Sequence, residues 1–496
     1  MVLALNDNPP MSSKAKNGPA RSVMVLGTTS GAGKSWLATA LCRWYARRGL
    51  KVAPFKAQNM SNNARVVGGG EIGSAQYFQA LAANAVPDVR MNPLLLKPER
   101  DTRSQVVLMG QVNEELSALP WRGRSERVWP RIARALDELR AENDVVVVEG
   151  AGSPAEINLM ASDIVNMRIA RHAQARCLLA TDIDRGGAFA HLYGTWALLP
   201  EADRALLQGF VLNKFRGDAA LLAPAPQQLQ ELTGVPTVAT LPMWWQHGLP
   251  EEDGVFDDRS RASGTVTRTV AVVAYPRISN LDEFQALKNV PGVRLVWART
   301  PADVAAADWI VLPGSKHTSG DLAWLRAQGL DRAVAAHAER GGAVLGICGG
   351  LQMLGEALVD PHGIDGNAPG LGLLPLVTVF AREKTVRHRT ANFGELGGAW
   401  AALSDVPVAG YEIHHGQTAA HPQLAHDGQP VMPDGLAWQN ARGNVLGIYM
   451  HGLFEDPGAL HALFGASAPT LDATFDGLAD FIDSHFDAGV LAGLIA

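Results

Sequence analysis

Short, largely apolar runs recur along this chain, and each is followed by glycine, acidic or amide residues. In the first half they are Lys51–Phe55, Val23–Leu26, Val145–Val148, Cys177–Thr181 and Gly209–Leu212; in the second half they are Val270–Ala274, Arg294–Trp297, Trp309–Leu312 and Ala343–Ile347. Strands of a parallel sheet are covered on both faces, so they appear as unbroken apolar runs. The pattern therefore predicts buried parallel strands in both halves.

Apolar residues at helical spacing separate several of these runs. Examples are Leu37, Leu41 and Trp44, and then Val128, Ile132, Leu136 and Leu139. Alternation of strand and helix predicts an α/β fold with one parallel sheet in each half. We expect a disordered tail (1–20), a first α/β domain (21–253), a linker (254–268), a second α/β domain (269–460) and a C-terminal helical extension (461–496).

Composition excludes several classes of protein. The chain has 496 residues and a net charge of −6, so it lacks the basic field expected of a nucleic-acid-binding protein. It has no apolar run that could span a bilayer and no secretion signal at its start. Three scattered cysteines allow neither a disulfide framework nor a zinc site. We expect a cytoplasmic protein with no membrane or nucleic-acid partner, and a homo-oligomer remains open.

The segment Gly27–Ser35 follows the first apolar run and opens a helix. A glycine-rich turn between strand and helix presents bare N–H groups to phosphate. Lys34 can reach the β- and γ-phosphates and Ser35 can bind Mg²⁺. Thr28 occupies the place of the first glycine in the standard P-loop, and an incidental glycine-rich turn is the alternative.

Polar residues at other strand ends could complete this site. Glu149 ends a buried strand and is a candidate ligand for Mg²⁺. Asn213 and Lys214 follow another strand, where they could face a nucleotide base or only form a turn. The amide-rich segment Pro54–Asn63 could bind ligand or be a solvated loop. A helix is predicted over Gly68–Ala83.

A second signal is the strand–turn–helix segment around Cys348. Gly346 and Gly350 permit a nucleophile elbow with cysteine in place of serine. The helix N-terminus favours the thiolate, the N–H of Gly349 can stabilise an oxyanion, and Gly314 can supply a second donor. A buried, inert cysteine is the alternative.

The thiolate requires a base, and His451 ends a short apolar strand before Gly452. No carboxylate lies two residues beyond it, because Leu453 stands there. We therefore predict a Cys–His dyad and identify no third member. Thr318 and Asp321 resemble a helix capping pair.

These motifs resemble those of the cobyric acid synthase family, the glutamine-dependent amidases of cobalamin biosynthesis. The resemblance runs from about Val23 to Asp456. It is carried by Gly27–Ser35, Pro54–Asn63, Glu71–Gln76, Met91–Pro98, Glu149–Leu159, Asp182–Gly187, Asn213–Asp218, Tyr275–Asn280, Pro313–Lys316, Gly346–Gly350 and Tyr449–Phe454. The P-loop is similar to that of dethiobiotin synthetases. The second half is similar to class-I glutamine amidotransferases of the branch that lacks His-x-Glu.

The resemblance implies ATP- and glutamine-dependent amidation of the b, d, e and g carboxylates of adenosylcobyrinic acid a,c-diamide, with Mg²⁺ and an acyl phosphate. It implies phosphate binding by Thr29, Gly31, Ala32, Gly33, Lys34 and Ser35, metal binding by Ser35 and Glu149 with Glu71 as a weaker candidate, and base binding by Asn213. Lys56 matches a lysine near the reacting carboxylate. Charge complementarity assigns Arg185, Lys214 and Arg216 to the corrin carboxylates.

Two other interpretations remain open at this point. The sister enzyme, which amidates the a and c carboxylates, has the same two domains and chemistry. A P-loop switch ATPase, which uses ATP to drive association, belongs to a different class and would need neither Cys348 nor His451. Glutamine hydrolysis discriminates the switch from either amidase.

Overall fold

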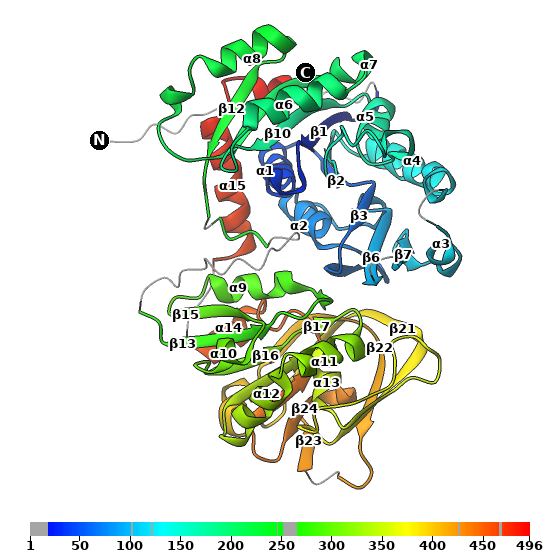
Figure 1. Cartoon of the computed structure of the whole chain (residues 1–496), viewed down its shortest axis with the longest axis vertical. Helices are drawn as coiled ribbons and strands as arrows, with labels where there is room; N and C mark the ends of the chain where they lie inside the picture. Colours follow the sequence, from blue (N-terminus) through cyan, green and yellow to red (C-terminus); the bar gives the residue numbers. More distant parts are fainter. Residues whose placement is uncertain are drawn as a thin grey trace.

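The computed structural model describes residues 18–100, 103–120, 123–245, 247–250, 265–424, 427–465 and 469–496. Two α/β halves lie one above the other in Figure 1, with the first half of the chain in the upper one. Most of the expected tail and linker, residues 1–17 and 251–264, lies outside the described residues.

The upper half is built on a six-stranded parallel sheet of order β12-β11-β10-β1-β9-β2. Its strands are β1 (Arg21–Gly27), β2 (Val52–Phe55), β9 (Val145–Glu149), β10 (Arg176–Asp182), β11 (Leu207–Phe215) and β12 (Thr237–Pro242). The predicted strands and their parallel arrangement are confirmed. Their carboxyl ends meet at one edge, which is where open α/β sheets bind ligands.

Helices cover both faces of this sheet. They are α1 (Lys34–Ala46), α2 (Ser74–Ala82), α3 (Glu114–Ala118), α4 (Arg124–Glu142), α5 (Met167–Ala173), α6 (Ala188–Leu198), α7 (Glu201–Arg204) and α8 (Ala225–Thr233). One apolar cluster joins α1 to Val23 and Val147 of the sheet, and another joins α4 to Met24 and Val148. Neighbouring strand residues thus face opposite layers, which is why the valine run at Val145 is unbroken.

Two small sheets are formed by the chain between α1 and α3. β3 (Gln58–Met60), β6 (Leu94–Arg100), β7 (Arg103–Leu108) and β8 (Gln111–Val112) form one, and β4 (Ala64–Val67) with β5 (Gly70–Gly73) forms the other. The helix predicted over Gly68–Ala83 is wrong in its first part. Gly68 and Gly69 both have positive φ (54° and 80°) and close a two-residue hairpin turn, so the helix starts only at Ser74.

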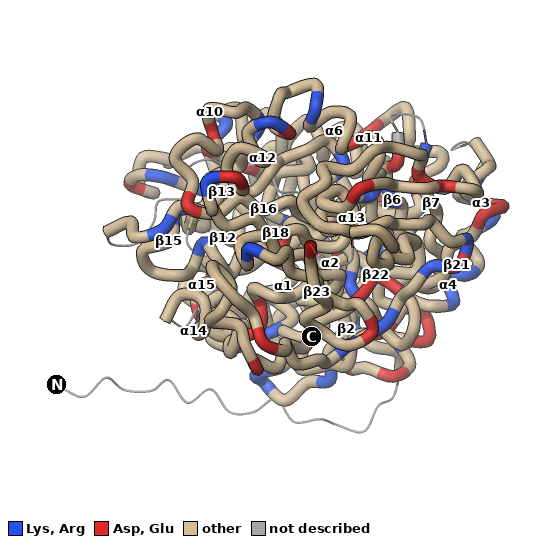
Figure 2. The backbone as a smooth tube through the Cα atoms, turned by 90° about the horizontal axis from the view of Figure 1, so that it is seen from below, with Lys and Arg blue, Asp and Glu red and all other residues tan. Residues whose placement is uncertain are grey.

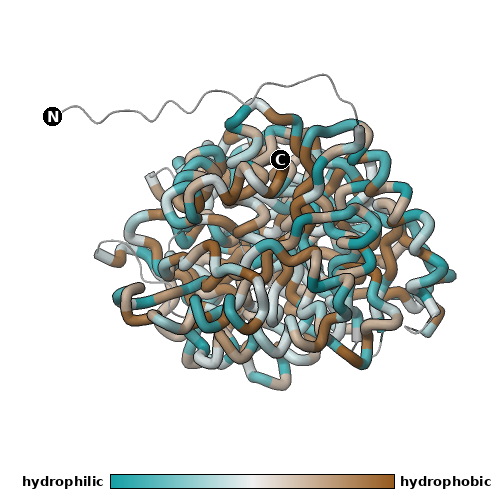
Figure 3. Tube along the Cα trace, turned by 90° about the horizontal axis from the view of Figure 1, so that it is seen from above, coloured by the Kyte–Doolittle hydropathy of each residue, from teal (hydrophilic) through white to brown (hydrophobic). Residues whose placement is uncertain are grey.

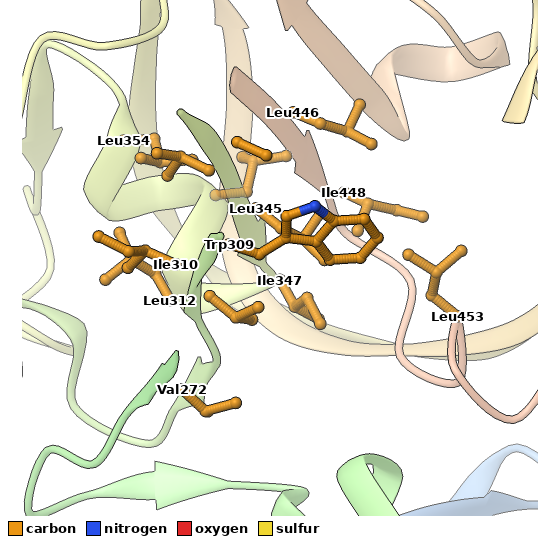
Figure 4. Close-up of a cluster of buried hydrophobic side chains, with 14 of the residues drawn as sticks. Val272, Trp309, Ile310, Leu312, Leu345, Ile347, Leu354, Leu446, Ile448 and Leu453 are labelled. Carbon is orange, nitrogen blue, oxygen red and sulfur yellow. The ribbon is translucent and has the colours of Figure 1, made fainter. Parts of the chain in front are cut away.

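The lower half contains a seven-stranded sheet of order β15-β13-β16-β18-β25-β24-β23. Its five parallel strands are β13 (Arg268–Val273), β15 (Val293–Ala298), β16 (Trp309–Leu312), β18 (Ala343–Ile347) and β25 (Val445–Ile448), and antiparallel β24 (Ala437–Asn440) and β23 (Gly428–Pro430) extend one edge. The strands predicted here are confirmed. Figure 4 shows side chains of β16, β18 and β25, among them Trp309 and Ile448, packed into one core.

Helices and shorter strands complete the lower half. The helices are α9 (Gln285–Lys288), α10 (Pro301–Val304), α11 (Thr318–Ala327), α12 (Leu330–Glu339), α13 (Gly349–Leu354) and α14 (Pro457–Phe464). The strands are β14 (Ile278–Ser279) paired with β17 (Gly314–Ser315), and a sheet of β20 (Ala368–Pro369), β19 (Ala357–Val359), β21 (Leu376–Asn392) and β22 (Pro407–Ala420). The long β21–β22 ribbon reaches towards the upper half (Figure 1).

The C-terminal helices α15 (Leu471–His485) and α16 (Val490–Gly493) return to the upper half, where α15 is drawn in red beside α1 (Figure 1). Phe475 and Ile482 of α15 are buried with Leu41 of α1. Arg43 donates to Asp476 (2.8 Å) and the Trp44 indole donates to Asp483 (2.6 Å). The end of the chain therefore completes the core of its first half.

Charged residues of both signs are interspersed over the fold (Figure 2), and apolar and polar segments alternate around it (Figure 3). In the part of the chain that the structure describes, no helix has both the length and the apolar character needed to cross a bilayer.

Candidate active sites

The first candidate site is the loop between β1 and α1. Gly33 has φ of +91° at the start of α1, a conformation that favours glycine. The Lys34 ammonium folds back over the loop and donates to the carbonyls of Thr29 (2.9 Å), Ser30 (3.2 Å) and Gly152 (3.3 Å). Thr28, which replaces the usual glycine, donates to the Thr181 hydroxyl (2.9 Å) and so links the loop to β10. The loop has the form expected of a phosphate-binding turn.

Glu149 lies at the centre of this site and is 1% exposed. One of its oxygens accepts hydrogen bonds from Ser35 Oγ (2.8 Å) and Lys56 Nζ (2.8 Å), and the other accepts from Gln79 (2.6 Å) and Gln76 (3.3 Å) of α2. Burial alone would raise the pKa of Glu149. The Lys56 ammonium and the hydrogen bonds from Gln79 and Ser35 outweigh it, so the pKa lies below its usual value and the carboxyl is ionised.

This arrangement fits Mg²⁺ together with a nucleotide. The ionised carboxylate of Glu149 and the Ser35 hydroxyl are hard oxygen ligands at the mouth of the phosphate loop. Among the described residues, no group of three or more His, Cys, Asp or Glu side chains could hold a metal. Mg²⁺ in proteins is usually held by one or two carboxylates or other protein oxygens together with substrate phosphates.

Asn213 ends β11 directly against the loop. Its amide donates to the Ala32 carbonyl (2.8 Å), and a Cβ on Gly33 would lie 2.1 Å from its Nδ2. A cavity of about 450 Å³ opens at the ends of β11 and β12, with Phe215, Thr240 and Trp245 in its lining, and Asn213 is not among its lining residues. Its lining is mixed, because Arg216 and His485 lie in it beside the apolar and aromatic side chains.

Three cations follow along the same sheet edge. Lys214 donates to the Gly31 carbonyl (2.9 Å) and to Asp182 (3.2 Å), Arg185 pairs with Asp182 (3.3 Å), and Arg216 donates to Asp184 (2.8 Å). The side chains of Arg185 and Arg216 are both 64% exposed. The three predicted substrate-binding cations are thus brought together beside the phosphate loop.

Glu71 lies elsewhere. It is in β5, and its two oxygens accept from Lys97 (2.7 Å) and from Lys384 (2.5 Å) of the lower half. Burial would raise its pKa, but Lys384 and Lys97 hold it well below the usual range. The hydrogen bonds of Glu71 therefore place it in a contact between the two halves and not in the cluster around Glu149.

The second candidate site is the turn at Cys348. This residue has φ of +51° and ψ of −104°, a strained backbone for a residue other than glycine. A Cβ on Gly350 would lie 1.8 Å from the Leu312 carbonyl oxygen, and one on Gly346 would lie 2.6 Å from the Gly350 backbone. Only glycine fits at both positions, so the nucleophile elbow predicted from the sequence is present.

The two predicted oxyanion donors lie on either side of this turn. A Cβ on Gly349 would lie 2.8 Å from the Ser315 nitrogen, and one on Gly314 would lie 2.7 Å from the imidazole of His451. The Ser315 hydroxyl donates to Asp321 (2.6 Å), which also accepts from the Arg277 N–H (3.1 Å). The capping pair predicted for Thr318 and Asp321 is wrong, because Asp321 holds this loop and the His317 side chain caps the helix.

His451 completes the site. Its Nδ1 donates to Glu283 Oε1 (3.1 Å), while the Cys348 thiol donates to the Ile413 carbonyl (3.8 Å). The other Glu283 oxygen accepts from the N–H of Gly452 (3.0 Å). Burial would lower the pKa of His451, but Glu283 and Cys348 raise it to about 10. The imidazole is therefore protonated near neutral pH and can stabilise a thiolate.

The comparisons with known proteins match a domain family to each half of the chain. A "CobQ/CobB/MinD/ParA nucleotide binding domain" matches residues 23–250, and a "CobB/CobQ-like glutamine amidotransferase domain" matches residues 269–459. The cobyric acid synthase of Variovorax paradoxus is 88% identical, covering 96% of this chain and 99% of its own. The cobyric acid synthase of Polaromonas naphthalenivorans is 77% identical, covering 96% of this chain and 100% of its own. That of Leptothrix cholodnii is 64% identical, covering 96% of this chain and 98% of its own.

The chain belongs to the cobyric acid synthase family. The family resemblance inferred from the motifs is confirmed. The fold class is also confirmed: an N-terminal P-loop domain with a parallel sheet precedes a glutamine amidotransferase domain. A solved glutamine amidotransferase that covers 42% of this chain at 19% identity has a TM-score of only 0.30, too low to support an argument.

Glu283 is the site residue that sequence reasoning missed in this cobyric acid synthase family member. It is 168 residues from His451 in the chain and is fully buried. The only local signal is the acidic pair Asp282–Glu283 directly after the Tyr275–Asn280 motif. Nothing in the spacing of the two residues predicts their contact, because the turn that carries Glu283 reaches His451 through the tertiary fold. The structure thus extends the predicted Cys–His dyad to a triad.

Proposed function

We propose that this chain catalyses the ATP- and glutamine-dependent amidation of the b, d, e and g carboxylates of adenosylcobyrinic acid a,c-diamide. The observation that carries the proposal is the presence of both assembled sites in a chain 88% identical, over nearly its full length, to a cobyric acid synthase. We also propose a cytoplasmic location, which suits three free thiols and ATP as a substrate.

The lower site would release ammonia from glutamine. The Cys348 thiolate would attack the side-chain amide carbon, and the N–H groups of Gly349 and Gly314 would stabilise the oxyanion. The His451 imidazolium gives its proton to the departing nitrogen, and Glu283 holds the ring by accepting from Nδ1. Water then attacks the thioester, which frees glutamate and restores the thiol.

The upper site would activate the carboxylate. An oxygen of the corrin carboxylate attacks the γ-phosphorus of ATP, the bond to ADP breaks, and an acyl phosphate forms. Ammonia displaces phosphate to give the amide. Lys34 and the loop N–H groups would bind the phosphates, Lys56 would offset charge on the reacting oxygens, and Arg185, Lys214 and Arg216 would bind other carboxylates of the substrate. Mg²⁺ held by Ser35 and Glu149 would neutralise phosphate charge.

The test is the mass of the product after incubation with ATP, Mg²⁺, glutamine and the corrinoid diamide. Four successive carboxylate-to-amide shifts are expected. No reaction of the diamide, with two amidations of the unamidated corrinoid, would identify the sister enzyme instead. ATP hydrolysis without change in either corrinoid would favour the switch ATPase.

Cys348→Ala separates the two sites in the same assay. The variant should lose amidation with glutamine, because it has no nucleophile, and should retain it with ammonium salts, because the upper site is intact. Loss of both activities would contradict the proposed division of labour.

A further inference from the structure

A buried arginine of the nucleotide-binding domain contacts the glutaminase domain next to its triad. Arg65 lies in β4, and its side chain is only 3% exposed. It donates to both oxygens of Glu455 (2.7 and 2.5 Å) and, through Nε, to Asp282 (3.1 Å). The side chain of Asp282 is 1% exposed and that of Glu455 is 31% exposed, so the Asp282 half of this contact lies away from bulk solvent.

The two carboxylates belong to the segments that carry the triad. Asp282 directly precedes Glu283, and both lie in the 3-10 turn Leu281–Phe284. Glu455 follows His451 by one turn, and its N–H donates to the Gly452 carbonyl (3.0 Å). The guanidinium therefore joins, from the other domain, the chain segment of the triad acid to the chain segment of the triad base.

A second route reaches His451 through Tyr411. The Arg65 guanidinium lies 5.1 Å from the centre of the Tyr411 ring, and that ring stacks on the His451 imidazole at 5.4 Å. The His451 N–H donates to the Tyr411 carbonyl (2.9 Å). Arg65 thus contacts the stacking partner of the catalytic imidazole and Asp282, the residue that directly precedes its hydrogen-bond partner Glu283.

On its own domain Arg65 packs against α2, and the start of its strand β4 makes a reciprocal contact with the other domain. The rings of Phe78 and Tyr77 lie 4.9 and 5.6 Å from its guanidinium. Asn63 accepts from the Leu281 N–H and Asn280 accepts from the Ala64 N–H, both at 3.0 Å. Because α2 also supplies Gln76 and Gln79 to Glu149, the same helix contacts both the nucleotide site and Arg65.

We propose that Arg65 is a positioning residue for glutamine hydrolysis. It acts across the domain boundary by holding the segment that carries Glu283 against the segment that carries His451. This inference rests on the glutaminase half of the proposed function. Without the cation, Asp282 and Glu455 would face each other beside Glu283 as uncompensated charges. Breaking a buried ion pair in this way is strongly unfavourable, so the segments would move apart or take up protons.

The experiment compares full-length Arg65→Met and Arg65→Lys chains with the wild type. Glutamate release gives kcat and KM for glutamine, and ammonia-dependent amidation reports on the upper site. We expect at least a tenfold fall in glutaminase kcat for Arg65→Met, little change in KM, and intact ammonia-dependent amidation. Arg65→Lys should recover part of kcat, because it restores the charge without the bidentate geometry.

His388→Gln is the matched control. His388 Nε2 donates to the Val66 carbonyl (2.9 Å), so its side chain crosses the same domain boundary onto the same strand. Its backbone pairs with Tyr411 in the β21–β22 ladder, and replacing the side chain leaves that pairing in place. Its glutaminase activity should equal that of the wild type. An unchanged kcat in Arg65→Met, or an equal loss of glutamine- and ammonia-dependent activity, would overturn the proposal.

Two further measurements separate the proposed role of Arg65 from a general loss of folding and from a wrong assignment of the substrate. The double variant Arg65→Met, Asp282→Asn removes one cation and one anion. Its melting temperature should lie closer to that of the wild type than that of Arg65→Met does, but its glutaminase kcat should stay low. Full recovery of kcat would overturn a positioning role. A wild type that releases glutamate but amidates no corrinoid would refute only the proposed substrate. A wild type that releases no glutamate would refute both inferences.

Discussion

At the scale of single residues, the charge on Glu283 controls the protonation of the catalytic imidazole. Its carboxylate accepts the hydrogen bond from His451 Nδ1, and together with Cys348 it raises the pKa of His451 to about 10. An imidazolium that persists well above neutral pH can protonate the leaving nitrogen. The pH range of glutamine hydrolysis should therefore depend on Glu283.

We expect Glu283→Gln to lower glutaminase kcat by about 10²-fold. Loss of the negative charge lowers the pKa of His451, so the imidazolium is lost at lower pH, and the alkaline fall in activity should move to lower pH. The measurement is the pH dependence of glutamate release, with the exposed Glu339→Gln as a control. An alkaline limb at the same pH as in the wild type would contradict this role.

Residues that share a local motif could be predicted from the sequence. Cys348 and its flanking glycines, and Lys34 with Ser35, each lie within one strand–turn–helix segment, where neighbours in the chain are neighbours in space. Residues brought in by the tertiary fold could not be predicted. Glu283 has no fixed spacing from His451. Nothing in the sequence predicts that Glu71, a weaker metal candidate implied by the family resemblance, accepts hydrogen bonds from lysines of β6 and β21.

At the scale of elements, the amphipathic C-terminal segment shows that a sequence pattern can predict a helix without predicting its packing partner. A helix was expected after residue 460, and α15 is present, but an apolar stripe does not say which surface it covers. Here that surface is α1, which carries the phosphate loop at its N-terminus. The last long helix thereby supports the first functional element of the chain.

We expect Phe475→Ala to destabilise the nucleotide-binding domain by about 3–5 kcal/mol, because Phe475 is 1% exposed and its removal leaves a cavity against α1. Denaturant titration followed by tryptophan fluorescence measures the effect. Leu471→Ala on the same helix is the control, since Leu471 is 36% exposed and should cost much less. Equal effects of the two substitutions would contradict the packing of α15 on α1.

At the scale of the whole molecule, several contacts join the two halves besides the covalent connection. Arg65 binds Asp282 and Glu455, Lys384 donates to Glu71, Lys316 donates to Glu99 (3.0 Å), and α15 crosses back to α1. The contacts made by Arg65 and Glu71 are buried, and salt screens buried pairs much less than exposed ones.

We therefore expect the halves to stay together when the chain is cut. A protease site inserted after residue 257 should yield two fragments that elute as one species in gel filtration. This should hold even in 0.5 M salt, where the Debye length is about 4 Å. The same cut in a chain that lacks residues 469–496 should weaken the association. Separate elution of the fragments from the otherwise complete chain would contradict the expectation.

The return of α15 to α1 also has a consequence for the order of synthesis. When residue 250 leaves the ribosome, the surface of α1 that will pack against Phe475 is still uncovered. At ordinary rates of translation, the intervening stretch takes on the order of 10–40 s to make. During that time the P-loop domain lacks part of its core, so a chaperone has a defined apolar surface to protect until the last helix emerges.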